Sequence, residues 1–278
     1  TKKEALVKLN AIGRKLGFPS KWEDYSSLRF FADRYALNYR EMSRFSVAKN
    51  FAELGKPVDK DKWGMPAHMV NAYYHPLLNE IAFPAGIMQA PFFDEHFEDA
   101  VNYGRIGMVI GHEFTHGFDD MGSKFAADGS FTNWWTEEDR EKFTARAAKL
   151  ITQYNELVPA GLDEQYHVNG ELTIGENIGD LGGLAIAWKA YQLSLGDKEA
   201  PVIDGLTGGE RFFLSWANSW QQKARPEEAI RLLTIDPHSP PEFRCNQIVR
   251  NIDAFYDAFD VSPDDKMWLA PDQRVTIW

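Results

Sequence analysis

The sequence predicts a mainly α-helical domain with one small β region, spanning residues 1–278. Apolar residues recur at intervals of three and four along most of the chain, which is the spacing of one helix face. Only residues 67–88 show short apolar runs around a turn, as paired strands do. With 44% hydrophobic residues among 278, the chain can bury a core for one large domain or two closely packed lobes.

The N-terminal part is expected to hold two helices followed by the strand pair. Residues 2–16 carry leucine and isoleucine at helical spacing, and Gly17 ends the pattern. Residues 28–54 form a long, charged helical segment that Gly55 stops. In residues 67–88, apolar residues on both sides of a turn with proline and asparagine predict two strands.

Helices dominate the remainder of the predicted fold. Thr136 is expected to cap a helix that runs to about Leu157, because acidic residues fill its first turn. Further helices are predicted around Glu176 and over residues 210–223 and 242–258. The connections at residues 159–170 and 196–209 are expected to be solvent-facing loops.

The most informative motif is His112-Glu113-Phe114-Thr115-His116, which follows a mostly apolar stretch. Positions i and i+4 lie on the same face of a helix, so both imidazoles can reach one metal ion, and zinc suits them. Glu113 follows the first imidazole and can act as general base for a water molecule at the open coordination position. The structural alternative is a helix with two hydrogen-bonded core histidines.

A third protein ligand is needed, and its identity separates the classes of zinc site. An extended motif would place His at position 122, where this chain has Gly122, so that class is excluded. Glu176 and Asp180, at i and i+4 on a later helix, offer a ligand and a partner for the outer N–H of an imidazole. Asp119, three residues after His116, can serve the other ring in the same way. An acidic pair on a helix face is otherwise usually solvated.

The chain as a whole resembles the neprilysin and endothelin-converting-enzyme family of zinc endopeptidases, in its bacterial oligopeptidase form. The resemblance covers essentially all residues and corresponds to the C-terminal catalytic half of the family, which implies a thermolysin-like zincin fold of the gluzincin type. The segments that carry it are residues 70–74 (VNAYY), 83–87 (FPAGI), 91–93 (PFF), 111–120 (GHEFTHGFDD), 175–180 (GENIGD), 236–240 (DPHSP) and 243–244 (FR).

The resemblance implies a role for each matching residue at the centre of the site. It makes His112, His116 and Glu176 the ligands of one Zn²⁺ ion, and it makes Glu113 the general base. It places Asp119 and Asp180 behind the imidazoles, and Asp180 is also counted among the catalytic residues.

A second group of residues is similar to the family's substrate-binding set. Asn71 and Ala72 correspond to a clamp on the substrate backbone, and His238 to a stabiliser of the oxyanion. Arg244 corresponds to the residue that binds a substrate carbonyl. The apolar wall around the residue after the cut falls on Phe92, Val109 and Trp220.

The residues alone leave other interpretations of this second group open. His238 lies in a loop rich in turn residues, where a single histidine is more often at the surface. Arg244 also fits a charge on a helix surface, and Asn71 fits a cap before a strand. Phe92 and Trp220 are of residue types that more often belong to an ordinary core.

Composition excludes several classes of partner. The formal net charge of −11 and the lack of a basic cluster argue against nucleic-acid binding. The chain has no run of about 18 apolar residues that would predict a membrane-spanning helix.

Cys245 is the only cysteine, so no intrachain disulfide or thiolate zinc cluster is expected. Animal cell-surface members of the family carry disulfides, and the difference suggests a bacterial-type enzyme.

We therefore expect a zinc-dependent endopeptidase that hydrolyses short peptides on the amino side of bulky hydrophobic residues. The alternative is a zinc-containing peptide-binding module, or an inactive fragment that needs a complementary N-terminal half. The expected partners are peptide substrates and the family's upstream helical domain, which is absent from this chain. Turnover of a fluorogenic peptide separates the two functions.

Overall fold

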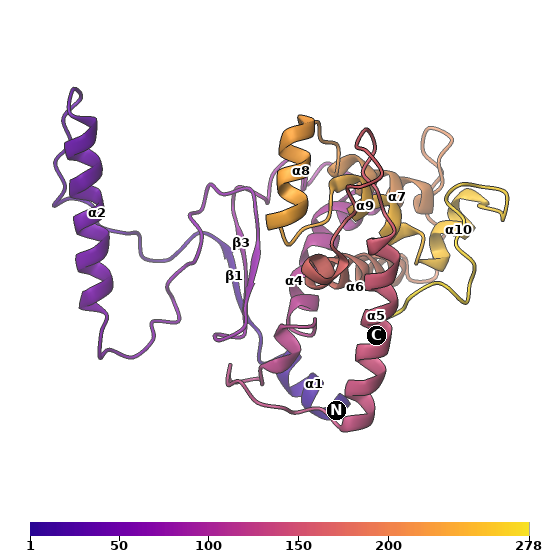
Figure 1. The fold of residues 1–278 in the computed structure, drawn as a ribbon, viewed down its shortest axis with the longest axis horizontal. Helices are drawn as coiled ribbons and strands as arrows, with labels where there is room; N and C mark the ends of the chain where they lie inside the picture. Colours follow the sequence, from indigo (N-terminus) through magenta and orange to yellow (C-terminus); the bar gives the residue numbers. More distant parts are fainter. Residues whose placement is uncertain (278) are drawn as a thin grey trace.

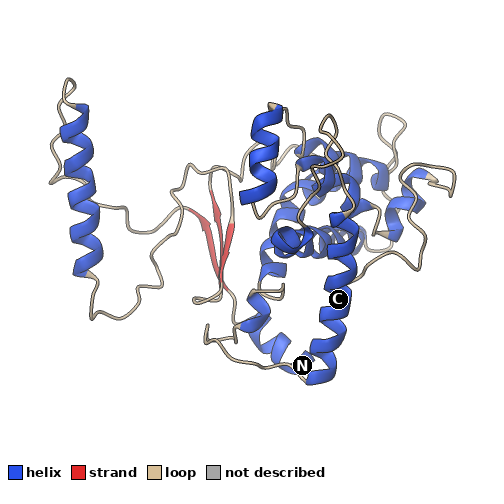
Figure 2. Ribbon diagram, in the orientation of Figure 1, coloured by secondary structure: helices blue, strands red, loops and turns tan. Residues whose placement is uncertain are grey.

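The computed structural model describes residues 1–277 and shows a helical body, a small sheet beside it and one helix standing apart (Figure 1). Helices predominate over strands (Figure 2), so the predicted class, mainly α with a small sheet, is confirmed. The elements are α1 (Lys2–Asn10), β1 (Gly13–Gly17), α2 (Tyr35–Ala52), β2 (Tyr73–His75), β3 (Glu80–Pro84), α3 (Asp99–Asn102), the π-helix η1 (Tyr103–Gly107), α4 (Met108–His116), the 3-10 helix η2 (Gly122–Lys124), α5 (Glu137–Asn155), α6 (Gly170–Leu195), α7 (Gly208–Ser219), α8 (Pro226–Ile235), α9 (Pro241–Val249) and α10 (Asp253–Phe259).

The sheet contains the two predicted strands and a third that the sequence did not predict. Its order is β1-β3-β2, with β1 parallel and β2 antiparallel to β3. The expected helix over residues 2–16 is therefore wrong after Asn10, because the later part pairs with β3 as a strand. Leu16 fits the helical spacing, yet its side chain is exposed. Pairing with a distant strand outweighs this local pattern.

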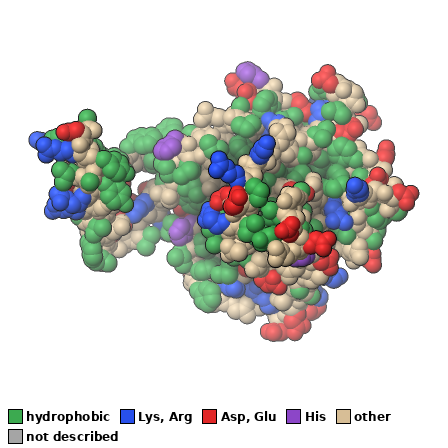
Figure 3. Space-filling model, turned by 45° about the horizontal axis from the view of Figure 1, so that its top comes forward, with side chains coloured by type: hydrophobic (Ala, Val, Ile, Leu, Met, Phe, Trp, Pro, Cys, Tyr) green, Lys and Arg blue, Asp and Glu red, His purple; other side chains and the backbone are tan. Residues whose placement is uncertain are grey.

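Helix α2 lies away from the rest of the molecule (Figure 1). The expected helix over residues 28–54 is wrong at its beginning, since the helix starts at Tyr35. None of its residues is buried, and large apolar side chains such as Tyr35, Tyr39 and Phe51 are mostly exposed. Hydrophobic side chains accordingly cover much of this projecting part (Figure 3).

Helices α4 and α6 lie directly against each other through glycines. A Cβ atom at Gly183 would lie 2.6 Å from the backbone nitrogen of His112, and one at Gly111 would lie 2.6 Å from the Gly183 carbonyl oxygen. No side chain fits at these positions. Each glycine in a helix costs about 1 kcal/mol relative to alanine, so the close contact explains why α6 carries them, as its sequence suggested.

The main core surrounds α6. Leu181, Leu184 and Tyr191 of this helix are buried together with residues from α5, α7, α9 and α10. Aromatic rings from α6 and α7 pack against one another, with Trp188 stacked on Phe213 at a centroid distance of 5.4 Å. This large apolar core fixes α6 as a rigid support.

The remaining helices agree with the sequence in part. Helix α5 follows its predicted cap, since the Thr136 side chain accepts a hydrogen bond from the Asp139 backbone. The predicted helix over residues 242–258 is wrong as one element, because buried Asn251 separates α9 from α10. Its side chain donates to the Gln247 carbonyl and accepts from the Val275 N–H, which holds the chain in a bend.

The predicted helix over residues 210–223 corresponds to α7, which ends earlier at Ser219, and α8 was not predicted. Proline at the first position of α8 provides its fixed backbone angle at the start. Within residues 1–277, no helix combines the length and the apolar character that crossing a membrane requires.

Candidate metal centre and substrate pocket

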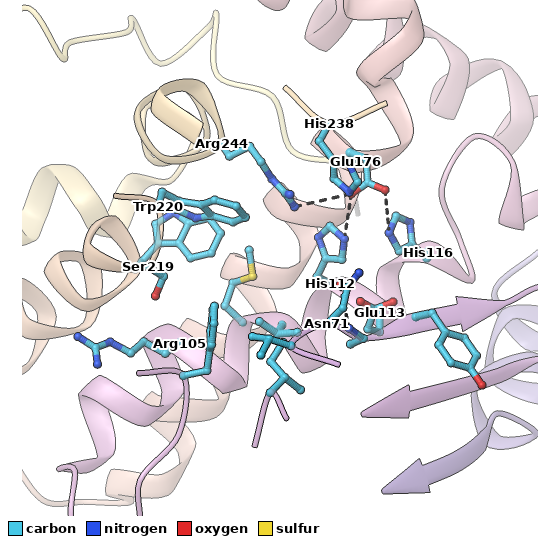
Figure 4. A pocket seen from close by; sticks show the side chains of 18 of the residues that line it. Asn71, Arg105, His112, Glu113, His116, Glu176, Ser219, Trp220, His238 and Arg244 are labelled. Atoms are coloured by element: carbon cyan, nitrogen blue, oxygen red, sulfur yellow. Dashed lines mark hydrogen bonds and ion pairs between the residues drawn. The ribbon is translucent and has the colours of Figure 1, made fainter. Parts of the chain in front are cut away.

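Two helices bring three potential metal ligands together. Helix α4 supplies His112 and His116, and α6 supplies Glu176, with one ligand atom of each lying within 4.8 Å of the others. The Nε2 atom of His112 lies 3.2 Å from Glu176 Oε2, and that of His116 lies 3.6 Å from Glu176 Oε1. All three side chains face a common point (Figure 4).

The outer nitrogens of both imidazoles face carboxylates. Asp119 Oδ2 lies 2.7 Å from His116 Nδ1, and Asp180 Oδ1 lies 2.9 Å from His112 Nδ1. With these nitrogens protonated, both Nε2 lone pairs are directed at Glu176. Two neutral imidazoles and one carboxylate form a set that fits zinc and leaves a fourth position open.

The carboxylate of Glu176 fits the same interpretation. Its Oε2 atom is buried and has no hydrogen-bond partner among the described residues, although cationic or imidazole nitrogens of His112, His238 and Arg244 lie 3.2 to 3.6 Å away. A buried carboxylate oxygen without a hydrogen bond is costly unless it binds a cation. The donor set therefore suits a divalent metal ion.

Asp119 is itself held in place by backbone groups. Its Oδ1 atom accepts hydrogen bonds from the N–H groups of Met121 and Gly122, at 2.9 and 2.6 Å. Lys8 of α1, which is fully buried, donates to the carbonyl oxygens of Gly122 and Phe125 at 2.7 Å. The loop after α4 is thus fixed from two sides, and it presents Asp119 to His116.

Asp180 forms a buried ion pair that spacing in the sequence did not reveal. Arg244 of α9 donates to both of its oxygens at 2.7 Å, and the guanidinium lies 4.1 Å from the centroid of the Trp220 ring. Burial acts to raise the pKa of Asp180, but Arg244 and His112 outweigh it and hold the pKa below its ordinary value. Asp180 therefore remains charged behind His112.

Glu113 and His238 complete the polar side of the site. Burial raises the pKa of the Glu113 carboxyl group, as does the neighbouring Glu176 carboxylate, while the charge of Arg244 opposes that rise. His238 is about half exposed, and its Nδ1 atom lies 2.7 Å from Asp236 Oδ1. Its Nε2 atom points at Glu176, 3.2 Å away. The sequence gave Asp236 no role, although it orients this ring.

The candidate substrate residues line one pocket with the metal group. The pocket has a volume of about 420 Å³. It is lined by the predicted residues Asn71, Ala72, Phe92, Val109, Trp220, His238 and Arg244, and also by Ile87, Arg105, Met108, Trp216 and Ser219, which the sequence did not single out. These residues come from segments that are far apart in the sequence, and the fold places them around one pocket.

Asn71 and Ala72 lie immediately before β2, at the free edge of the sheet. The Asn71 side chain accepts a hydrogen bond from the Ala72 backbone at 2.9 Å. Because β2 pairs only with β3 in the described sheet, its other edge has backbone groups free to pair with an extended chain. The pocket therefore combines a strand edge, an apolar wall and a polar centre.

Comparison with known proteins agrees with this geometry. The model of the family described as Peptidase family M13 matches residues 71–275, and the chain belongs to this family. A neutral endopeptidase of Lactobacillus helveticus is 41% identical over 283 residues, covering all of this chain and 41% of that protein. Neprilysin of Homo sapiens is 37% identical over 290 residues, covering all of this chain and 38% of neprilysin.

A solved structure is also closely similar. The zinc metalloprotease Zmp1 of Mycobacterium tuberculosis, in complex with an inhibitor, has a TM-score of 0.97 and 53% sequence identity, covering all of this chain and 43% of Zmp1. The fold is thus that of the family's zinc metalloproteases, and the zincin class expected from the sequence is confirmed. The chain spans about two fifths of the length of the curated relatives that it matches.

The buried pair of Asp180 and Arg244 generates a first prediction. Asp180→Asn keeps the shape of the side chain but leaves the Arg244 charge without its partner, so the free energy of unfolding should fall by about 3 kcal/mol. The measurement is denaturant unfolding in the presence of a chelator, which removes any contribution from metal binding.

Glu228→Gln is the matched control, since it removes one partner of an exposed bidentate pair with Arg231. Solvent screens that pair, so stability should hardly change. Equal effects of the two substitutions would contradict the importance of the buried pair.

Proposed function

We propose that this chain is the catalytic part of a zinc-dependent endopeptidase. The observation that supports this best is the convergence of His112, His116 and Glu176, with Glu113 beside them in the same pocket. Membership of Peptidase family M13 and the similarity to proteins named neutral endopeptidase and neprilysin point to the same activity.

In the proposed site, the two imidazole Nε2 atoms and the Glu176 carboxylate hold one zinc ion. Zinc in such a site supplies Lewis acidity and lowers the pKa of water, which makes a nucleophile available near neutral pH. Asp119 and Asp180 fix the orientation of the two imidazoles and increase their basicity.

Glu113 is the proposed general base. Its carboxylate takes a proton from the attacking water molecule and then passes that proton to the nitrogen of the leaving amine. The burial that raises its pKa suits this task, because a base with a pKa closer to neutral both accepts and returns a proton. Burial also excludes competing solvent from the transfer.

His238 and Arg244 are the proposed stabilisers of the reacting carbonyl. In its imidazolium form, His238 donates a hydrogen bond from Nδ1 to Asp236, and it can donate a second one from Nε2 to the oxygen that becomes negative during attack. Arg244 uses Nε and Nη2 to bind Asp180, and its Nη1 can donate to a substrate carbonyl beside the scissile bond.

The substrate is proposed to bind as an added strand. Asn71 and Ala72 clamp its backbone at the free edge of β2, and the residue after the cut enters the apolar part of the pocket. Phe92, Val109 and Trp220 line that part. The expected preference is cleavage on the amino side of bulky hydrophobic residues.

Replacing the proposed base tests the mechanism. Glu113→Gln should retain about one zinc per chain, because Glu113 is no ligand, and should lose peptidase activity by several orders of magnitude. Metal analysis and turnover of a fluorogenic peptide are measured on the same sample. Glu164→Gln, an exposed loop substitution, is the control and should behave as the unsubstituted protein. Full activity of Glu113→Gln would refute the mechanism.

A peptide library tests the apolar pocket. One methylene in such a pocket is worth about 1–3 kcal/mol, so Phe and Leu after the cut should be strongly favoured over Asp and Lys. Val109→Phe should fill the pocket and shift the preference towards smaller residues. Ile110→Phe changes the exposed neighbour on the same helix and should leave the preference unaltered. Uniform tolerance of Asp and Lys would exclude the pocket assignment.

We further propose that the complete enzyme contains an upstream helical region that covers α2. Relatives are more than twice as long as this chain, and α2 has no buried residue. Apolar side chains before it, including Phe30 and Phe31, are also more than half exposed, and Leu6 of α1 nearly so. Large apolar side chains exposed in such number usually mark an interface. Without that region, the chain would be the peptide-binding or inactive fragment that the sequence left open.

Hydrogen exchange tests the upstream region. In the 278-residue chain alone, the amides of α2 should exchange rapidly, whereas those of α5, which packs on the core, should be protected. In a longer protein that includes the upstream region, α2 should become protected. Light scattering on the isolated chain should show self-association. A monomeric, cooperatively folded 278-residue chain that cleaves short peptides and protects α2 would contradict the proposal.

A further inference from the structure

Arg105 lies at the end of the pocket that the metal group does not occupy. It belongs to the π-helical turn η1, which leads into α4, and it lines the same cavity as His112 and Glu113. Its side chain lies near Ser219, across the pocket from His116 and His238 (Figure 4). The reaction proposed above gives this residue no role.

The contacts of Arg105 are all with uncharged groups. Its Nη1 atom donates to the carbonyl oxygen of Pro91 at 2.8 Å, and Nη2 donates to Asn218 Oδ1 at 3.2 Å. The guanidinium carbon lies 5.3 Å from the centroid of the Phe97 ring. Its Nε atom is buried and has no hydrogen-bond partner within residues 1–277. Two of its five N–H groups are thus engaged.

No carboxylate of the described residues lies within 4 Å of this guanidinium. The other two arginines that are well buried near the pocket and α7 differ in this respect. Arg244 binds Asp180, and Arg211 binds Glu98 at 2.7 Å. A partly buried cation without a counter-ion is unfavourable, and burial lowers the pKa of Arg105 for that reason. An anion bound beside it would relieve this cost.

The position of Arg105 indicates which part of a substrate it would meet. Pro91, which accepts its hydrogen bond, precedes Phe92, and Val109 follows Arg105 at i+4. Phe92 and Val109 form the apolar wall proposed for the residue after the cut. A group that reaches past that wall, away from the metal group, therefore lies on the carboxyl side of the scissile bond.

We propose that Arg105 binds a carboxylate of the substrate, located just beyond the residue that fills the apolar pocket. This inference rests on the proposed peptidase function. The carboxylate can be the C-terminus of a short peptide or the side chain of Asp or Glu, and both offer the planar, bidentate acceptor that a guanidinium favours. The enzyme would then prefer substrates that end shortly after the cleaved bond or carry an acidic residue there, in spite of its own negative net charge.

Binding to zinc-loaded, full-length Glu113→Gln protein tests this directly, since that variant should not consume the probes. The first pair of probes is acetyl-Ala-Ala-Phe-Ala as free acid and as amide. The second pair is acetyl-Ala-Ala-Phe-Glu amide and acetyl-Ala-Ala-Phe-Gln amide. The free acid should bind about tenfold or more tightly than its amide, as expected for a charge-assisted hydrogen bond in a partly dry site. A preference in the second pair would identify side chains as an additional source.

Two substitutions in this background remove the charge in different ways. Arg105→Gln keeps a hydrogen-bond donor but has no charge, and the ratio between acid and amide should fall to about one. Asn218→Asp keeps Arg105 and gives it a carboxylate partner in the place of the amide oxygen. It should also abolish the preference without loss of stability, which makes it informative if Arg105→Gln does not fold.

Arg105→Lys should retain part of the preference, and Arg14→Gln on the exposed strand β1 should retain all of it. The proposal would be overturned if the Glu113→Gln protein, with Arg105 intact, bound the free acid and the amide equally. It would also be overturned if the preference for the free acid persisted in both the Arg105→Gln and the Asn218→Asp variants. Cleavage rates of the unsubstituted protein, which retains Glu113, distinguish a failure of this proposal from a failure of the proposed peptidase function. Cleavage without selectivity refutes only the role of Arg105, whereas selective binding without cleavage refutes only the peptidase.

Discussion

The direct contact between α4 and α6 is the constraint on which the site depends. A Cβ atom at Gly183 would lie 2.6 Å from the backbone nitrogen of His112, and one at Gly182 would lie 2.7 Å from the Thr115 side chain. The helices can therefore approach this closely only because both positions lack a side chain. With side chains at these positions the two helices would lie farther apart, and Glu176 would stand farther from the two imidazoles. The core around α6 holds this arrangement in place.

The charged groups of the site lie in two layers. Near the pocket, Glu113 and Glu176 face the imidazoles, and behind them Asp119 and Asp180 fix the ring orientations. Arg244 neutralises Asp180 and stacks on Trp220, so it connects the polar layer to the apolar wall. Arg105, at the other end, has no such partner within the described residues. This contrast is what suggests a role for Arg105 with a ligand.

The sequence revealed the parts of the site that follow from local spacing. His112, Glu113 and His116 share one helical turn, and Glu176 and Asp180 share another, so their grouping could be predicted. The ion pair of Asp180 with Arg244 joins residues 64 positions apart, and Asp236 and Arg105 acquire meaning only from their neighbours in space. Strand β1 was missed because its partner β3 lies far along the chain, and α9 and α10 were merged because the hydrogen bonds of Asn251 are tertiary.

Zinc affinity of a Gly183→Ala variant tests most directly whether the helix contact creates the metal centre. Competition with a chromophoric chelator measures it, beside Gly107→Ala, where a Cβ atom would have no neighbour closer than 3.4 Å. A shift of the helices should misplace Glu176, so Gly183→Ala should bind zinc about tenfold or more weakly, comparable to the loss of a supporting partner. Gly107→Ala should bind as the unsubstituted chain. An unchanged zinc affinity in a fully folded Gly183→Ala protein would contradict the account.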